Sequence, residues 1–395
     1  MIVKHATLTA VLCLGAWCLH GQDPTWTEVL TQIEQNNTEL KSYRTHLEAG
    51  AEARQAEQGL NGPSIGGYYM PWGEHTSGDY WEVEATQTFA FPTLYGAQRA
   101  TRSAQALADA QAYALRRQAV LWEAQQVLMQ QVHCQKRKQL AEGRRQRAER
   151  MLRHTEGRFA AEEVNRVALH QAQLALLEAE MQVEDWEHQY REAGQRLAGL
   201  NGGQPLTVTL AAYPDRVDSV AIIELWEQVK ARDPALRQAQ AQVVVAEHQQ
   251  QEVRHAQLPQ LTLGANYQGV PSEGYGGVYA GISLPLWKTQ PAQAAAQRRL
   301  EAEQLALRAL EETTRAQWEQ EVMHYHHKVA QYYTYQATLA QLEAEDFLME
   351  AYTLGHLSFT EYARELEYYQ DAQETLLSIE YDLQKLRAGL LKFEL

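Results

Sequence analysis

The sequence repeats one pattern of landmarks in its two halves, and this duplication constrains the fold more than any other feature. Asn37-Thr38-Glu39-Leu40 opens a helical stretch in the first half, and Asp233-Pro234-Ala235-Leu236 opens one in the second. A proline follows the leucine of each motif after 23 residues, at Pro63 and at Pro259. Because matched landmarks recur at equal spacing, we expect one structural plan to be used twice.

A second pair of intervals supports the duplication. The distance along the chain from Pro92 to Phe159 is 67 residues, and the distance from Pro285 to Tyr352 is also 67 residues. Each of these prolines closes an extended segment, and each aromatic residue precedes a change in the helical pattern. The two halves therefore share an extended region followed by a long helical region.

The halves meet at a glycine-rich seam. Asn201-Gly202-Gly203-Gln204-Pro205 interrupts the helical pattern, and the short β-like run Leu206–Leu210 follows it. We therefore divide the mature chain into a first repeat, residues 22–205, and a second repeat, residues 206–395.

Each repeat contains a stretch in which the hydrophobic pattern has period two. In the first repeat, residues 64–72 and 79–89 lie between turn signals, and apolar and polar residues alternate over 79–89. Alternation of this kind is typical of strands with one apolar and one polar face. The sequence predicts one β-hairpin at 64–89 and a second at 260–284, with the loop of the second at Val270–Gly274.

The remainder of each repeat lacks helix-breaking residues over long distances. No proline lies between Pro92 and Pro205, and none follows Pro291. Residues 94–160 can therefore form one helix about 100 Å long, at a rise of about 1.5 Å per residue. A helix of this length cannot fold back into a compact globule, so the helices must pack side by side.

Apolar residues at heptad spacing indicate how these helices pair. Steps of seven residues connect two series that are typical of coiled-coil seams, namely Leu169, Leu176, Val183, Tyr190 and Leu197 in the first repeat and Tyr362, Tyr369, Leu376, Leu383 and Leu390 in the second. We expect long helical hairpins that reverse direction near residues 158–165 and 352–360.

The N-terminus is predicted to be a signal peptide covering residues 1–21. Lys4 precedes an apolar stretch at 6–19, and the chain then becomes polar. This length suits a signal peptide rather than a membrane-spanning helix. A lipoprotein with a lipidated Cys18, or a buried N-terminal helix, is the alternative interpretation. Cleavage would leave Cys134 as the single cysteine, so no intrachain disulfide is expected.

Composition and motifs exclude several classes of function. The formal net charge is −15, which argues against nucleic acid as a partner. The sequence contains no nucleophile motif, no glycine-rich phosphate loop and no paired-cysteine metal site. We therefore expect neither an enzyme nor a bound cofactor.

The strands must be combined between chains if they enter a membrane. An open sheet in lipid leaves backbone groups unpaired at a cost of several kcal/mol each, and the smallest closed barrels contain about eight strands. Three chains with four strands each would provide twelve. Aromatic residues cluster in or beside the strands, as an interfacial girdle would, including Tyr68, Tyr69, Trp72, Tyr80, Trp81, Tyr267, Tyr275, Tyr279 and Trp287. A soluble β-subdomain that caps a helical bundle is the alternative.

The motifs together resemble the TolC-type outer-membrane efflux protein family. Each motif is weak alone, but their order, spacing and duplication are specific and extend over residues 24–395. The motifs that carry the resemblance are Asn37–Leu40, Asp233–Leu236, Leu258–Leu261, Phe91–Gln98 and Tyr352–Glu361.

The resemblance implies a fold and an assembly. It implies a mainly α chain with a transmembrane β part, which in a homotrimer forms a 12-stranded β-barrel and a periplasmic α-helical barrel. It implies location in the outer membrane of a Gram-negative-type bacterium, and a passive exit duct that works with a periplasmic adaptor and an inner-membrane pump. The run at residues 91–98 resembles the heavy-metal branch of the family, while drugs, dyes and bile-type amphiphiles remain open as substrates.

The resemblance also indicates residues at the helical tips, with two departures. Glu162 stands where the first tip would have glycine, and Glu361 and Arg364 stand where some members have an aspartate pair at the periplasmic mouth. Glu361 and Glu365 could form a cation-favouring mouth or a solvated helix face. The expected adaptor contacts at the tips are Arg158, Phe159, Asn165, Gly355, His356 and Ser358.

One cluster has the side chains of a metal site. Met323, His324 and His327 share one face of a helix, because residues three and four apart are neighbours. Thioether and imidazole groups suit soft or borderline metals such as copper, silver or zinc. A polar helix segment with scattered histidines explains the same pattern.

A periplasmic coiled-coil scaffold without a pore is the alternative to the channel. Four amphipathic segments of about ten residues favour the channel, because that is the length of a tilted membrane strand.

Overall fold

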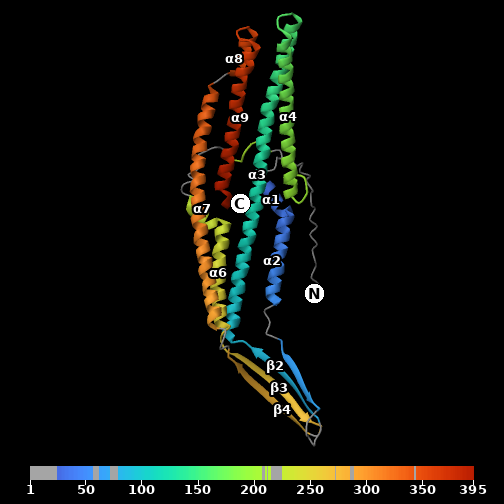
Figure 1. The fold of residues 1–395 in the computed structure, drawn as a ribbon, viewed down its shortest axis with the longest axis vertical. Coiled ribbons are helices and arrows are strands. Elements are labelled where there is room, and N and C mark those ends of the chain that lie inside the picture. Colours follow the sequence, from blue (N-terminus) through green and yellow to red (C-terminus); the bar gives the residue numbers. More distant parts are fainter. Residues whose placement is uncertain are drawn as a thin grey trace, which may run out of the picture.

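The chain forms an elongated molecule whose helices run along the long axis. A sheet lies at one end, and the tips of two helical hairpins lie at the other (Figure 1). The structure is a computed structural model, and it describes residues 25–56, 62–71, 79–206, 210, 212–214, 225–271, 273–284, 289–341 and 344–395. The expected signal peptide, Cys18, Trp72, Trp287 and most of the seam after Leu206 lie outside these residues.

The first repeat contains two short helices, a hairpin and a long helical hairpin. The elements are α1 (Trp26–Asn36), α2 (Thr38–Ala56), β1 (Ser64–Met70), β2 (Tyr80–Phe89), α3 (Pro92–Ala160) and α4 (Arg166–Leu200). Pro92 lies at the first helical position of α3, where its missing N–H is harmless. α3 then runs without interruption from the sheet to the first tip (Figure 1).

The second repeat follows the same order. Its elements are α5 (Trp226–Arg232), α6 (Pro234–His255), β3 (Gln260–Val270), β4 (Glu273–Ser283), α7 (Thr289–Ala340), α8 (Ala344–Thr353), α9 (Phe359–Leu390) and the 3₁₀ turn η2 (Lys392–Glu394). In place of one helix as long as α3, this repeat has α7 and α8. The predicted fold class of long helical hairpins with four strands per chain is confirmed.

The duplicated motifs at Asn37 and Asp233 adopt the same local geometry. Asn37 has φ −57° and ψ 118°, and Asp233 has φ −57° and ψ 120°. Each residue ends one helix and begins the next, and its side-chain oxygen accepts a hydrogen bond from the backbone N–H of Leu40 (2.9 Å) or Leu236 (3.2 Å). Side-chain capping of this kind satisfies an N–H group that the helix leaves free.

The two hairpins join into one antiparallel sheet in the order β1-β2-β3-β4. β2 and β3 pair from Trp81 opposite Gly269 to Phe89 opposite Leu261, although the strands belong to different repeats. The loop expected at Val270–Gly274 was predicted too long, since pairing continues to Val270 opposite Glu273. A tight turn leaves more backbone groups in the ladder.

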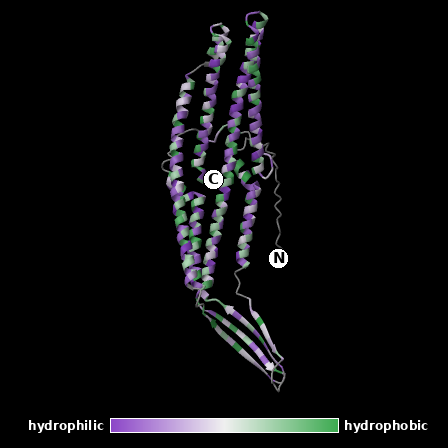
Figure 2. Cartoon of the chain, in the orientation of Figure 1, coloured by the Kyte–Doolittle hydropathy of each residue, from purple (hydrophilic) through white to green (hydrophobic). Residues whose placement is uncertain are grey.

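The apolar core is concentrated halfway along the molecule, where helix ends meet. One cluster joins α1, α2, α3 and α4, and a second joins α5, α7, α9 and η2. Of the predicted seams, Leu197, Tyr362, Leu383 and Leu390 are buried. Hydrophobic and hydrophilic residues are mixed along the helices (Figure 2). None of the described helices has an apolar stretch long enough to cross a bilayer.

Candidate functional site

The sheet has one apolar and one polar face, because alternate residues of a strand point to opposite sides. Ile65, Ala85, Ala265 and Val278 lie opposite one another across all four strands. Ile65 is 75% exposed and Val278 is 93% exposed. Large apolar side chains at this exposure, repeated along a face, mark a surface that contacts another apolar phase or another molecule.

The opposite face of the sheet is held by polar contacts between the repeats. Asn266 Nδ2 donates to Glu82 Oε1 at 2.9 Å, and the Tyr80 hydroxyl donates to Gln268 Oε1 at 2.8 Å. The Thr88 and Thr262 hydroxyls lie 3.0 Å apart. These contacts fix the side chains of β2 and β3 on the polar face.

All charges on the described part of the two hairpins are negative. Residues 64–71, 79–89, 260–271 and 273–284 contain Asp79, Glu82, Glu84 and Glu273 but no lysine, arginine or histidine. Glu82 and Glu84 lie on the polar face, in register with Gln268 and Asn266. A water-filled path along this face would have a negative potential that attracts cations.

The two helical tips have the same backbone hydrogen bonds, 193 residues apart. In the second tip, the N–H groups of Leu354, Gly355 and His356 donate to carbonyls of α8. The N–H groups of Ala161, Glu162 and Glu163 donate to the corresponding carbonyls of α3. Gly355 has φ +78°, and Glu162 has φ +58°. The correspondence of Glu162 with the tip glycine therefore extends to the backbone conformation.

Replacing Glu162 with glycine is expected to stabilise the first tip by about 1 kcal/mol, because a side chain at positive φ is strained. Amide hydrogen exchange at residues 159–166 should then slow about fivefold. The matched control is Ala161→Gly, where φ is −85° and glycine should destabilise. An equal effect of both substitutions would contradict the assignment of strain to Glu162.

The predicted tip residues have defined places, and several contact other parts of the chain. Asn165 caps α4 by accepting from the Ala168 N–H at 3.0 Å, and Ser358 caps α9. Arg158 pairs with Glu163 at 3.2 Å and also lies over the ring of Tyr352, 5.8 Å from its centre. Of the remaining tip residues, Gly355 and His356 are exposed and Phe159 is half-buried.

The predicted mouth residues take part in local contacts. Glu361 accepts hydrogen bonds from the Ser358 backbone N–H (2.9 Å) and hydroxyl (2.8 Å). The backbone bond, and then the hydroxyl, keep the pKa of the Glu361 carboxyl below its ordinary value, so it stays charged. Glu365 pairs with Arg364 at 3.0 Å. A role at a mouth stays a prediction.

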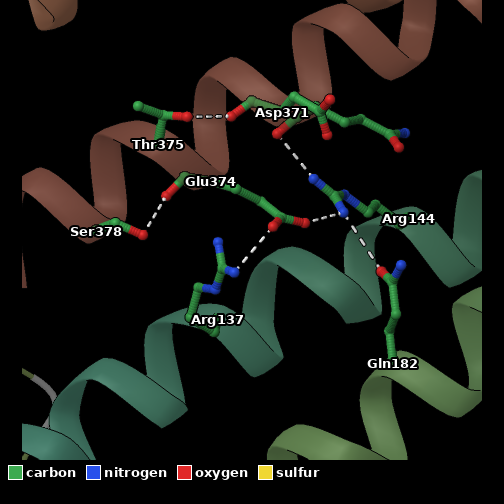
Figure 3. A network of polar contacts seen from close by, with 8 residues as sticks. Arg137, Arg144, Gln182, Asp371, Glu374, Thr375 and Ser378 are labelled. Carbon is green, nitrogen blue, oxygen red and sulfur yellow. Dashed lines mark hydrogen bonds and ion pairs between the residues drawn. The ribbon is translucent and has the colours of Figure 1, made fainter.

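A polar network that the sequence did not reveal joins three helices below the tips. Glu374 of α9 accepts from Arg137 at 2.8 Å and also from Arg144, both on α3. Arg144, which is 8% exposed, further donates to Gln182 of α4 at 3.3 Å and to the Gln370 carbonyl at 2.8 Å (Figure 3). A groove of about 470 Å³ adjoins the network between α3, α4 and α9.

Comparison with solved structures identifies the fold. CusC, studied for its folding and transmembrane channel formation, matches with a TM-score of 0.77 and 15% identity over 95% of both chains. The outer-membrane protein VceC from Vibrio cholerae matches with a TM-score of 0.74 and 13% identity over 93% of this chain and 95% of its own. The open MtrE outer-membrane channel of Neisseria gonorrhoeae matches with a TM-score of 0.65 and 15% identity over 94% of this chain and 89% of its own.

The chain has the fold of bacterial outer-membrane channels. No protein-family model matches the sequence, and no curated protein matches it. Identities of this size establish the fold only. The fold expected from the resemblance is therefore confirmed.

The candidate metal ligands lie on α7. Met323, His324 and His327 are exposed, while the neighbouring Val322 and Tyr325 are buried. No group of three or more His, Cys, Asp or Glu side chains in the described ranges is arranged to hold a metal ion. A soft-metal site on this face of α7 stays a prediction.

Sequence reasoning also missed an exposed apolar stripe on α4. Val167, Leu174, Leu177 and Met181 are 51–61% exposed and follow one face of the helix. The steps of seven, three and four residues are coiled-coil spacing, so the signal was present in the sequence beside the seam that was recognised.

Proposed function

We propose that the protein is the outer-membrane channel of a tripartite efflux system, a passive exit duct with a periplasmic extension. In this proposal three copies form a 12-stranded barrel and a helical tube, a periplasmic adaptor docks at the helical tips, and an inner-membrane pump supplies the substrate. The bacterium is of the Gram-negative type. The duct itself needs no catalytic group and no cofactor.

The observation that carries the proposal is the pair of unlike faces on the sheet. The apolar face exposes Ile65, Val278 and Ile282, the last of them 69% exposed, which suits contact with lipid. The polar face holds Glu82 and Glu84, which suits contact with water. β1 and β4 are the edge strands, and closure between copies would pair them.

Two further features support assembly from several copies. The exposed stripe on α4 is apolar and has coiled-coil spacing, so it suits a neighbouring helix. The tips are the only parts of the described helical hairpins presented endwise, and Leu354 at the second tip is 64% exposed. An exposed apolar side chain there suits docking of an adaptor.

Cations are the substrates that the charges favour. The described hairpins carry negative charges alone, and the whole chain has a formal charge of −15. Heavy-metal cations remain the finer proposal, with Met323, His324 and His327 as the residues concerned. Copper or silver sensitivity of a deletion strain, compared with its drug sensitivity, separates this substrate class from amphiphiles.

Purified protein in planar bilayers tests the channel. We expect detergent-extracted trimers that produce stepwise conductance after reconstitution. Recovery without detergent in the soluble periplasmic fraction, as a monomer or dimer, would overturn the proposal and favour a periplasmic coiled-coil scaffold without a pore.

A further inference from the structure

The polar face of the sheet carries three exposed aromatic rings. Tyr68 of β1 is 53% exposed, and Tyr275 and Tyr279 of β4 are 61% and 51% exposed. Strand alternation places all three on the polar face, because one row across the four strands consists of Tyr68, Glu82, Gln268 and Tyr275. The face that carries the carboxylates therefore also offers aromatic surface to a ligand.

The next row of the polar face contains a carboxylate beside a glycine. Glu84 of β2 lies opposite Gly66 of β1. The Glu84 side chain leans over this glycine, because a β-carbon placed on Gly66 would lie only 3.2 Å from Glu84 Oε1. The absence of a side chain at Gly66 therefore gives the Glu84 carboxylate room to lie against β1.

Of the two carboxylates on β2, Glu84 is the one available to a ligand. Glu82 Oε1 accepts a hydrogen bond from Asn266 Nδ2 at 2.9 Å, and Glu82 Oε2 lies 3.0 Å from the Tyr80 hydroxyl. Glu84 is half-buried and forms no hydrogen bond or ion pair with the described part of the chain. A carboxylate held in place without a counter-ion favours binding of a cation from solution.

Tyr68 lies within reach of the same cation. It follows Gly66 by two residues on the same face of β1, so the Cα atoms of the two residues are about 7 Å apart at the rise of a strand. An attractive contact between a cation and an aromatic ring extends to about 6 Å from the ring centre. A cation between Gly66 and Tyr68 would therefore contact both the Glu84 carboxylate and the Tyr68 ring.

We propose that this face binds an organic ammonium ion, with its charge on Glu84 and its alkyl groups against Tyr68. Aromatic rings attract alkylated ammonium groups, which hold water weakly, whereas a small hydrated cation such as Mg²⁺ gives up its water reluctantly and prefers oxygen ligands. The site rests on the proposed channel, because it lies in the path of a substrate only if the polar face lines the duct. The metal ligands expected on α7 lie outside the sheet, so the two hypotheses are tested separately.

Closure of the barrel would bring further rings to each site. β1 and β4 are the edge strands, so in the proposed trimer β4 of one copy lies beside β1 of the next. Tyr275 and Tyr279 are on the polar face of that β4, two residues to either side of Gly277. The strand that carries Tyr68 would then pair with a strand that carries two tyrosine rings of the neighbouring copy.

Block of the reconstituted pore by tetraethylammonium tests the site. Parent channels in planar bilayers should carry a K⁺ current that tetraethylammonium reduces in a concentration-dependent way. Tyr68→Leu should raise the blocking concentration about fivefold, because the contact between cation and ring is lost. Glu84→Gln should raise it by a similar factor, because the ion pair is lost. Tyr68→Phe keeps the ring and should restore the parent value.

The matched control is Tyr69→Leu. Tyr69 is the next residue of β1, but it lies on the apolar face, opposite Trp81, so this variant should be blocked like the parent. Equal block of the parent, Tyr68→Leu and Glu84→Gln channels would overturn the site while the channel itself stands. Block by Mg²⁺ but not by tetraethylammonium would overturn it as well. Failure of the parent protein to conduct would instead overturn the proposed channel, and the site with it.

Discussion

Replacing Glu82 and Glu84 with glutamine is expected to remove about half of the cation preference of the reconstituted pore. The two carboxylates lie on the polar face of the sheet, and the described hairpin residues contain no cationic side chain to offset them. Three copies would place six such carboxylates around one water-filled path. Their loss should move the reversal potential in a KCl gradient roughly halfway to zero, because a like-charged lining concentrates counter-ions.

The effect should depend on charge and on the face. Thr88→Val is the matched control, because it removes the hydroxyl contact with Thr262 on the same face without changing any charge. Both variants should conduct, which separates selectivity from channel formation. A reversal potential that stays the same in the glutamine variant would show that this face does not line the conducting path.

Replacing Glu374 with alanine should weaken the contact between α3 and α9 by about 2 kcal/mol, less than the 3–5 kcal/mol typical of a fully buried pair. Glu374 is 32% exposed, but its partners Arg137 and Arg144 are only 13% and 8% exposed. Its removal leaves two guanidinium groups close together in the helical wall. The unpaired charges, more than the lost bonds, destabilise the contact.

Hydrogen exchange measures this change locally. Amides of α9 around residues 366–378 should exchange about thirtyfold faster, which corresponds to about 2 kcal/mol. The matched control is Glu319→Ala, since Glu319 pairs with Arg315 at 2.8 Å on an exposed surface where both side chains are more than half exposed. That pair should contribute less than about 1 kcal/mol. If the amides around residues 366–378 exchanged at the same rate in the Glu374→Ala and Glu319→Ala variants, a stabilising role of the buried network would be refuted.

The parts of the fold that could be predicted depend on local chemistry. The motifs at Asn37 and Asp233 predicted two helix starts, because capping is an interaction between residues close together in the sequence. Strands β2, β3 and β4 followed from alternation in the same way, and β1 followed from the turn signals on either side of it. The pairing of β2 with β3 could not be predicted, because it depends on contacts between residues about 180 positions apart, such as Glu82 and Asn266.

The candidate site shows the same division. The backbone turn at Glu162 and Gly355 was visible as a repeated pattern, since both tips need one residue at positive φ. Arg144 was not recognised, because one arginine among many on α3 gives no sign that Gln182 and Glu374 will surround it. Long-range side-chain partners of this kind follow from helix packing, which a single sequence does not specify.

The uninterrupted course of α3 has a mechanical consequence. Its 69 residues correspond to roughly 100 Å, so one rod connects the strand end to the first tip. Alongside it, α2 and α4 meet end to end near Asn37, whose amide donates to the Leu200 carbonyl at 2.8 Å. Bending would be easiest at that junction, and α3, which is continuous alongside it, would resist the bending. A push applied at the tip is therefore transmitted to the strands through α3 as an axial load.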